Sequence, residues 1–494
     1  MQHSASEVVS ETASEATTVD ADLFSSATAL ARAIRQGVLS SVEAAQRYLD
    51  RADRANGALN ALIWRDDEAL LAAAERADRQ LRSGDAPGPF HGVPIPIKDL
   101  SNAAGQPNTS GGSRAMGDAP KQTNDLIVKR FLDAGFLLGG RSNSPEAGMI
   151  QVTENQRYGI TRNPWNLDRT PGGSSGGAAA LVAAGIAPVA HASDGGGSIR
   201  MPASCTGLVG LKPSRSRVPA ALPSWENCTT GGVVTRTVKD AARLLDVISV
   251  EDALGWYRAP RPERPFAEEV GGEVPKLRIG LLTSAPNGVP VDPDCVQATE
   301  RIARLLESDG HEIVPVEPGI IGAAISEIYL FTVIETALHT MEWERPELAE
   351  PYIVHRMRRA AERGAGDYVR AVRDMQLESR RVVAHWGRDF DLLLTPTLAT
   401  RVPEAGVMLE QANTILDGTN EREAQMMAFM VPANVTGLPA ISVPAGYDRD
   451  GLPLGAHLMG APFGEAALIR VASRLEASLR WDLEHPGLYV GEPR

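Results

Sequence analysis

Cysteine is scarce in this 494-residue chain, which has only Cys205, Cys228 and Cys295 and no two of them close together. An odd and sparse count supplies neither a disulfide framework nor a closely spaced pair of metal ligands. The sequence therefore favours a reducing compartment, and we expect a cytoplasmic protein that holds no metal.

Positive charge and aromatic residues are also in short supply. The chain has 49 Lys and Arg against 62 Asp and Glu, which gives a formal net charge of −13, and only 5% of its residues are aromatic. Because nucleic-acid binding needs a basic face, we expect no nucleic-acid partner. No apolar run approaches the about 20 residues that cross a bilayer, so we expect no membrane partner.

The organisation of the chain indicates a layered α/β protein. Residues 1–20 are rich in Ser, Thr, Glu and Ala, lack the basic start and apolar segment of a signal peptide, and are expected to be a disordered tail. Beyond them, apolar runs typical of strands alternate with helical periodicity, with helices expected over 293–308 and 465–479. No internal repeat or linker interrupts residues 21–494, which indicates one domain.

Three local patterns give finer expectations. Ser40 and Glu43 have the spacing of a capping box, which starts a helix that we expect to stop at Gly57. Residues 92–99 have the pattern of a buried strand, and their two prolines exclude a central place in a sheet for part of it. Residues 430–440 are expected to form a loop before the next strand.

Two glycine clusters surround serines, Pro-Gly-Gly-Ser-Ser-Gly-Gly at 171–177 and Asp-Gly-Gly-Gly-Ser-Ile-Arg at 194–200. Glycine lets backbone amides approach an anion closely, so this density indicates either a phosphate cradle or a nucleophile with an oxyanion hole. The lysine of a Walker loop is missing from both clusters, and neither has the spacing of a dinucleotide fingerprint. The patterns therefore disfavour nucleotide binding.

Two kinds of serine nucleophile fit these clusters. Residues 173–177 match G-x-S-x-G, the nucleophile elbow, which would make Ser175 the nucleophile. That chemistry needs a downstream acid and histidine, and the candidate His457 has the surroundings of a packed strand residue. The other kind is a serine activated by a lysine whose pKa is lowered by burial. Lys98 ends the apolar stretch 93–97, although a lone lysine is more often a solvated surface charge.

The chain resembles the amidase signature family of serine hydrolases in five segments that occur in the family's order, namely residues 92–99, 172–184, 194–200, 207–213 and 432–444. The resemblance implies a single large α/β domain over residues 21–494, with a central mixed, twisted β-sheet covered on both faces by helices. It also implies cofactor-free hydrolysis of carbon–nitrogen bonds other than peptide bonds, through a covalent acyl-serine intermediate.

The family's Ser–cisSer–Lys triad maps onto three residues of this chain. The resemblance implies that Ser198 is the nucleophile, that Ser174 is the bridging serine with a cis backbone, and that Lys98 is the base. These roles are chemically coherent, because the Ser174 hydroxyl both donates and accepts and so relays a proton to the neutral amine of Lys98.

The second glycine cluster provides the expected oxyanion hole, made by the amides of Gly195, Gly196 and Gly197 together with that of Ser198. We expect three residues to support the site, namely Ser175, Asp194 and Arg200. An arginine fork suits a nearby carboxylate, so Arg200 and Asp194 are expected to hold the loop. Many family members carry threonine where this chain has Gly195, so we expect a barer loop and an altered acyl pocket.

The substrate is indicated by one position. In the related tRNA amidotransferase subunits, an aspartate two residues before the phenylalanine of Phe-x-x-Pro-x-Asn holds the α-amino group of glutamine. This chain has Met427 there, ahead of Phe429, and we therefore expect no acidic anchor. The expected pocket residues are Met149, Met427, Phe429 and Met430, although ordinary packing of the methionines is an equal alternative. Small neutral apolar or aryl amides are the expected substrates, with esters and carbamates as further candidates.

Two other functions stay open at this point. One is the catalytic subunit of a glutamine-dependent tRNA amidotransferase, which acts only with partners. The other is a non-catalytic binding or scaffold protein with a decayed site, which the presence of all three triad positions disfavours. We expect a small amide and water as partners, and the sequence leaves a homodimer open.

Overall fold

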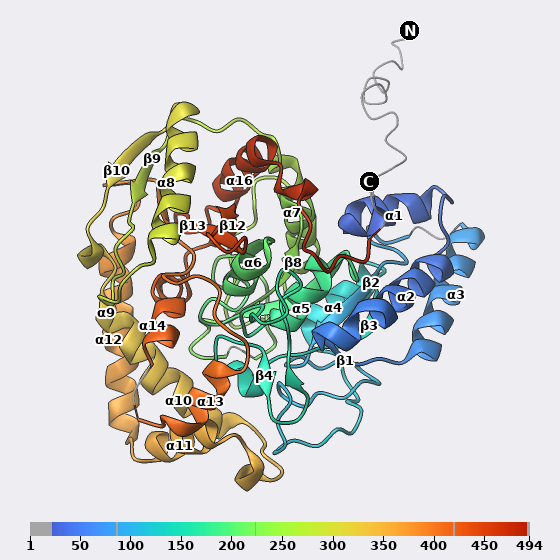
Figure 1. The fold of residues 1–494 in the computed structure, drawn as a ribbon, viewed down its shortest axis with the longest axis horizontal. Helices are drawn as coiled ribbons and strands as arrows, with labels where there is room; N and C mark the ends of the chain where they lie inside the picture. The colour runs from blue at the N-terminus through green and yellow to red at the C-terminus, as the bar shows by residue number, and fades with distance from the viewer. Residues whose placement is uncertain (1–21, 85–86, 223, 418–419, 492–494) are drawn as a thin grey trace.

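The computed structural model describes residues 22–84, 87–222, 224–417 and 420–491, and helices alternate with strands along most of this length (Figure 1). The tail expected at residues 1–20 lies outside these residues. The strands are β1 (Leu62–Trp64), β2 (Pro94–Lys98), β3 (Leu137–Ser142), β4 (Glu154–Asn155), β5 (Gly159–Ile160), β6 (Val189–Asp194), β7 (Val209–Lys212), β8 (Thr230–Thr235), β9 (Arg278–Leu281), β10 (Glu312–Pro315), β11 (Leu392–Pro396), β12 (Ala440–Tyr447) and β13 (Pro453–Met459).

The α-helices are α1 (Ala27–Arg35), α2 (Ser41–Leu59), α3 (Asp67–Ser83), α4 (Leu126–Asp133), α5 (Gly176–Ala183), α6 (Arg200–Thr206), α7 (Val238–Ile248), α8 (Pro293–Ser308), α9 (Ala323–Ile328), α10 (Glu335–Ala337), α11 (Pro351–Ala361), α12 (Ala365–Val383), α13 (Val407–Thr414), α14 (Glu421–Met427), α15 (Val431–Thr436) and α16 (Glu465–Leu479). A π-helical turn, η5 (Tyr329–Ile334), joins α9 to α10. None of the helices in the described segments is long and apolar enough to cross a membrane.

The large sheet is mixed. Its strand order is β10-β9-β11-β13-β12-β7-β8-β6, with parallel pairing among β10, β9 and β11 and antiparallel pairing from β11 to β6. Neighbouring residues of β11 alternate between two hydrophobic cores, with Leu392 and Leu394 in one and Leu393 in the other. Helices α7, α8 and α16 contribute to the first core, and α5 and α6 pack on the opposite side. The expected α/β fold with a helix-covered mixed sheet is confirmed.

A second, smaller sheet brings β2 to the edge of the large one. Its order is β1-β3-β2, so β2 lies at an edge, where prolines that cannot donate to a ladder are tolerated. β2 lies beside β6 of the large sheet, and the Lys98 N–H donates to His191 Nδ1 at 3.3 Å. Lys98 is therefore placed at the seam between the two sheets.

Two local expectations need correction. The capping box is present, with Ser40 Oγ accepting from the Glu43 N–H at 3.0 Å, but α2 continues past Gly57 to Leu59 and ends at a left-handed Asn60. The expected loop at 430–440 contains the helix α15, because a proline at the start of a helix removes no helical hydrogen bond. The helices expected at 293–308 and 465–479 are α8 and α16, with those bounds.

Candidate active site

Lys98 is the candidate base. It ends β2, is 0% exposed, and its Nζ lies 2.8 Å from the Oγ atoms of Ser174 and Ser175 and 3.1 Å from Ser193 Oγ. Burial lowers the pKa of Lys98 from 10.5 to about 7, against the opposing effect of Asp194. A large fraction of such an amine is neutral at physiological pH, and a neutral amine accepts a proton.

The turn before α5 holds Ser174 and Ser175 against Lys98. The peptide bond between Gly173 and Ser174 is cis. A Cβ on Gly173 would lie 2.7 Å from the backbone of a neighbouring loop, so a larger residue does not fit there. Ser175 Oγ lies 3.3 Å from the Ser193 carbonyl oxygen as well as 2.8 Å from Lys98 Nζ. Ser193, which the sequence analysis assigned no role, thus completes the polar surroundings of the amine.

Ser198 lies at the end of the second glycine cluster, between β6 and α6. Its side chain is 8% exposed, and it opens together with Ser174 into a cavity of about 460 Å³. Lys98 lies behind Ser174, on the buried side of this cavity. The structure therefore joins Lys98 to Ser174 by a hydrogen bond and places Ser174 and Ser198 on the wall of the same cavity.

The backbone amides next to Ser198 are not equivalent. Among the described residues, the N–H groups of Gly195, Gly196 and Ser198 have no hydrogen-bond partner. The N–H of Gly197 donates to Asp194 Oδ1 at 2.8 Å, so it cannot also serve an oxyanion. The prediction of Gly197 as an oxyanion donor is therefore wrong, and the amides of Gly195, Gly196 and Ser198 stay the predicted donors. Gly197 instead lets the loop turn, with a φ of 114°.

Asp194 and Arg200 form a fully buried ion pair beneath this loop. Arg200 Nε lies 2.9 Å from Asp194 Oδ2, and Arg200 Nη2 lies 3.0 Å from Asp194 Oδ1. Burial alone would raise the pKa of Asp194, but the Arg200 guanidinium holds that pKa well below its usual range. Asp194 also accepts from the N–H groups of Gly197 at 2.8 Å and Ile199 at 3.2 Å. The pair thus fixes the backbone on both sides of Ser198.

His457 supports the same ion pair. Its Nε2 lies 3.0 Å from Arg200 Nη1, and burial, reinforced by Arg200, lowers the pKa of His457 well below 6.5. A neutral imidazole accepts a hydrogen bond from an arginine, which donates only. The histidine that an elbow mechanism at Ser175 would need is thus engaged elsewhere.

The comparison with known proteins decides the family, because residues 43–469 match the model of the Amidase family. This chain belongs to the amidase family. A 6-aminohexanoate-cyclic-dimer hydrolase from Paenarthrobacter ureafaciens is 35% identical to it over 502 residues, which cover 94% of this chain and 97% of that enzyme. The family resemblance is confirmed.

Solved structures agree with this result. A 6-aminohexanoate cyclic dimer hydrolase complexed with substrate matches with a TM-score of 0.87 and 33% identity, over 95% of this chain and 100% of that one. A bacterial aryl acylamidase of the amidase signature family matches with a TM-score of 0.84 and 27% identity, over 93% and 98% of the two chains. The amidase is a hydrolase of carbon–nitrogen bonds other than peptide bonds, and the amidotransferase alternative is not favoured.

Two cavities of the amidase meet at Ser198. The larger cavity, of about 460 Å³, is also lined by Ser174 and Ser193. The smaller cavity, of about 40 Å³, lies beside Gly196. Apolar side chains make up most of the smaller cavity's wall, namely Met149, Ile150, Met201, Trp225, Leu330, Phe331, Ile334 and Met427.

Only two of the predicted pocket residues line these cavities. Met149 lines both, and Met427 lines the smaller one. Phe429 and Met430 are 0% exposed and line neither. A Cβ on Gly197 would lie 2.8 Å from the Cβ and Cγ of Met430, which therefore packs under the oxyanion loop. Their prediction as pocket residues is wrong, because they lead into the buried helix α15 where a loop was expected.

Polar side chains that no motif marked also line the smaller cavity. Gln151 Nε2 lies 2.9 Å from Met427 Sδ, and Arg356 Nη2 lies 3.5 Å from Glu423 Oε1. Burial raises the pKa of Glu423, against the opposing effect of Arg356. Glu423 lies one turn before Met427 on α14, so the wall is not entirely apolar. This carboxylate is, however, already paired.

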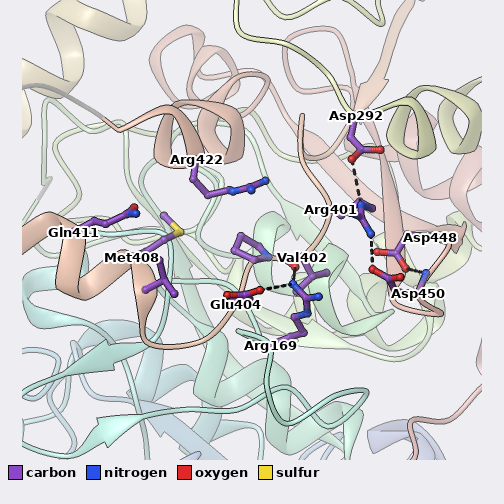
Figure 2. Close-up of a pocket in the computed structure, with 12 residues that line it drawn as sticks. Arg169, Asp292, Arg401, Val402, Glu404, Met408, Gln411, Arg422, Asp448 and Asp450 are labelled. Carbon is purple, nitrogen blue, oxygen red and sulfur yellow. Dashed lines mark hydrogen bonds and ion pairs between the residues drawn. The ribbon is translucent and has the colours of Figure 1, made fainter.

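A separate pocket of about 330 Å³ lies on another part of the amidase (Figure 2). Its charges pair with each other, with Arg401 Nε 3.2 Å from Asp292 Oδ2 and Arg169 Nη1 3.9 Å from Glu404 Oε1. It shares no residue with the cavities at Ser198. Within the described segments, no group of three or more His, Cys, Asp or Glu side chains could hold a metal ion.

An Asp194→Asn variant is expected to lower the free energy of unfolding by about 3–5 kcal/mol, because it leaves the buried Arg200 without its counter-charge. Urea denaturation measures this loss. Glu404→Gln is the matched control, since Glu404 is 68% exposed and 3.9 Å from its arginine, and it should cost less than about 1 kcal/mol. Equal losses in the two variants would show that the buried pair does not hold the loop.

Proposed function

We propose that this amidase hydrolyses small neutral amides to a carboxylate and an amine through an acyl intermediate on Ser198. One observation carries the proposal. The buried Nζ of Lys98 lies 2.8 Å from Ser174 Oγ, and Ser174 shares a cavity with Ser198, the serine next to free backbone amides. This arrangement supplies a base, a proton relay, a nucleophile and an oxyanion site.

The proposed reaction starts with proton transfer. The Ser198 proton passes to Ser174 as the Ser174 proton passes to neutral Lys98, while Ser198 Oγ attacks the amide carbon. The carbonyl oxygen becomes an oxyanion that accepts from the amides of Gly195, Gly196 and Ser198. The loss of one such donor typically raises the barrier by about 2.7–4 kcal/mol.

The second half of the reaction returns the proton. Lys98, now an ammonium, protonates the leaving nitrogen through Ser174, and the carbon–nitrogen bond breaks to leave an ester on Ser198. Water then attacks this ester while Lys98 again accepts a proton through Ser174, and that proton returns through Ser174 to Ser198 Oγ as the carboxylic acid departs. No cofactor enters these steps.

The substrate preference is proposed from the cavity walls. The wall of the smaller cavity is mostly apolar, and its one carboxylate among the described residues, Glu423, is paired with Arg356 at 3.5 Å. The larger cavity has more polar side chains in its wall and is also lined by Asp125. The relatives include hydrolases of a cyclic amide dimer and of aryl acylamides, as their names state. We therefore expect neutral aliphatic or aryl amides, and also activated esters and carbamates, to be better substrates than charged amino acid amides.

Glutamine is expected to have a kcat/KM at least tenfold below that of a neutral p-nitroanilide, about 1.4 kcal/mol in transition-state binding. The reason is that its ammonium would be buried in the smaller cavity beside Glu423, a carboxylate that is already paired with Arg356. Ammonia and nitroaniline release measure the two rates. The matched variant Met427→Asp supplies a carboxylate one turn from Glu423 and should raise the glutamine-to-anilide ratio. A wild-type enzyme that prefers glutamine tenfold would refute the neutral-substrate proposal.

A fluorophosphonate probe tests the proposed function directly. The enzyme should be labelled on Ser198 and lose turnover of a panel of aliphatic, aryl, peptide, ester and carbamate substrates, while EDTA should leave the rate unchanged. Inhibition by EDTA that added metal reverses would contradict the mechanism. A cytoplasmic location, a homodimer and the lack of nucleic-acid or membrane partners stay predictions, and light scattering on the purified protein tests the dimer.

A further inference from the structure

Trp225 lies between the two cavities that meet at Ser198. The half-buried indole lines both of them and covers Gly195 of the oxyanion loop. A Cβ on Gly195 would lie 2.4 Å from Trp225 Cζ3 and 3.1 Å from Thr229 Cγ2. The expectation of a barer loop is therefore wrong, because Trp225 fills the space that a threonine side chain at position 195 would occupy.

The backbone that presents Trp225 is strained. Trp225, Glu226 and Asn227 have φ angles of 52°, 55° and 56°, in the left-handed region that bulky residues rarely adopt. Arg215 Nε donates to the Asn227 carbonyl at 3.1 Å, and Tyr368 Oη donates to Glu226 Oε1 at 2.5 Å. Such strain persists where surrounding structure enforces it, which occurs mostly at functional sites.

Tyr329 joins Trp225 to the oxyanion loop from the opposite side. The two rings meet edge to face at 6.4 Å, and Tyr329 Oη donates to the Gly195 carbonyl at 2.7 Å. Tyr329 begins the π-helical turn η5, whose Leu330, Phe331 and Ile334 continue the wall of the smaller cavity. The wall and the loop therefore form one packed unit.

The proposed mechanism determines which part of the substrate enters which cavity. The leaving amine receives its proton through Ser174, which lines the larger cavity and is not among the described residues of the smaller one. The amine part of the substrate therefore belongs in the larger cavity, of about 460 Å³, and its acyl part belongs in the smaller cavity, of about 40 Å³. The acyl part has less than a tenth of the volume that is open to the amine part, which favours a short acyl group.

We propose that Trp225 is a specificity-determining residue that restricts this amidase to short acyl groups on bulky amines. The inference rests on the proposed function, because the assignment of the two sides uses Ser198 and Ser174 in their proposed roles. Truncation of the indole opens the smaller cavity into the larger one, and longer acyl chains then fit beside the oxyanion loop.

The test compares acetyl, butanoyl, hexanoyl and octanoyl p-nitroanilides. For the wild-type enzyme, kcat/KM should fall at least tenfold from acetyl to hexanoyl. In Trp225→Ala the hexanoyl-to-acetyl ratio should rise at least tenfold, and Trp225→Leu should give a smaller rise in the same direction. Trp165→Ala is the matched control, because Trp165 is also half-buried but lines neither cavity, and its ratio should stay at the wild-type value.

The close contact between Gly195 and Trp225 provides an independent test of the proposal. Gly195→Ala should reduce kcat/KM at least tenfold in the wild-type background, and much of this loss should disappear in the Trp225→Ala background, where the clash is absent. The proposal would be overturned by a hexanoyl-to-acetyl ratio of kcat/KM near one in the wild-type enzyme. It would also be overturned if this ratio in both Trp225 variants stayed within twofold of the wild-type value. Failure of the proposed function itself looks different, since no anilide would then be cleaved and no probe would label Ser198.

Discussion

A Ser198→Ala variant is expected to form no acyl-enzyme and to lose about 10⁴- to 10⁶-fold in kcat, the range seen when a serine hydrolase loses a member of its catalytic set. The expectation follows from position. Ser198 ends the loop whose unpartnered amides form the proposed oxyanion site, and it shares a cavity with the proposed relay serine, Ser174. Mass spectrometry of the protein after a fluorophosphonate pulse measures adduct formation, and anilide turnover measures kcat.

Ser175→Ala is the control for this experiment. Ser175 is 0% exposed and its Oγ lies 2.8 Å from Lys98 Nζ, so its loss should weaken the site while leaving measurable turnover and a labelled Ser198. An adduct mapped to Ser175, or an adduct retained in Ser198→Ala, would refute the assignment of the nucleophile.

The rate is expected to rise with pH and to level off above a midpoint near pH 7. The neutral form of Lys98 is the proposed base, and burial lowers its pKa to about 7. Below the midpoint the amine is protonated and cannot accept, so kcat/KM should fall about tenfold per pH unit. Lys98→Ala should lose most of the activity at neutral pH, by about 10²- to 10⁴-fold, while its circular dichroism spectrum is retained.

Lys212 provides a matched control for Lys98. It is also buried, and burial, reinforced by Arg200, lowers the pKa of Lys212 to about 7. Its Nζ, however, donates to the Pro213 carbonyl at 2.8 Å, and no contact with a serine hydroxyl is found among the described residues. Lys212→Met should therefore keep the acid limb near pH 7. If the midpoint moved in Lys212→Met and stayed near pH 7 in Lys98→Arg, the acid limb would belong to Lys212, and the assignment to Lys98 would be refuted.

The parts that the sequence predicted well depend on local signals. Helix α8 follows Asp292, whose side chain caps it, and has a proline at its first position, so its bounds could be placed from neighbouring residues alone. The two glycine clusters and Lys98 were found in the same way, since each carries its chemistry within a few residues. The mixed sheet followed from the resemblance.

The parts that the sequence did not predict depend on contacts between distant segments. Tyr329 lies 134 residues from Gly195 in the chain and reaches it only through packing of η5 against the loop. Neither Glu423 nor Arg356 belongs to a motif. The Gly197 N–H points away from an oxyanion because it donates to Asp194, whose carboxylate is held in place by Arg200. Composition and periodicity carry no signal for such contacts, although the glycine at 195 marks a place where another group fills the space.

The seam between the two sheets divides the catalytic groups between separately built parts of the molecule. Lys98 belongs to the small sheet, whereas Ser198 follows β6 of the large sheet. A chain in which only one sheet has formed would contain either the proposed base or the proposed nucleophile in place, but not both, so Ser198 would not be activated. Turnover is therefore expected to depend on the docking of the small sheet against the large one. Far-ultraviolet circular dichroism does not detect this docking, because it measures secondary structure.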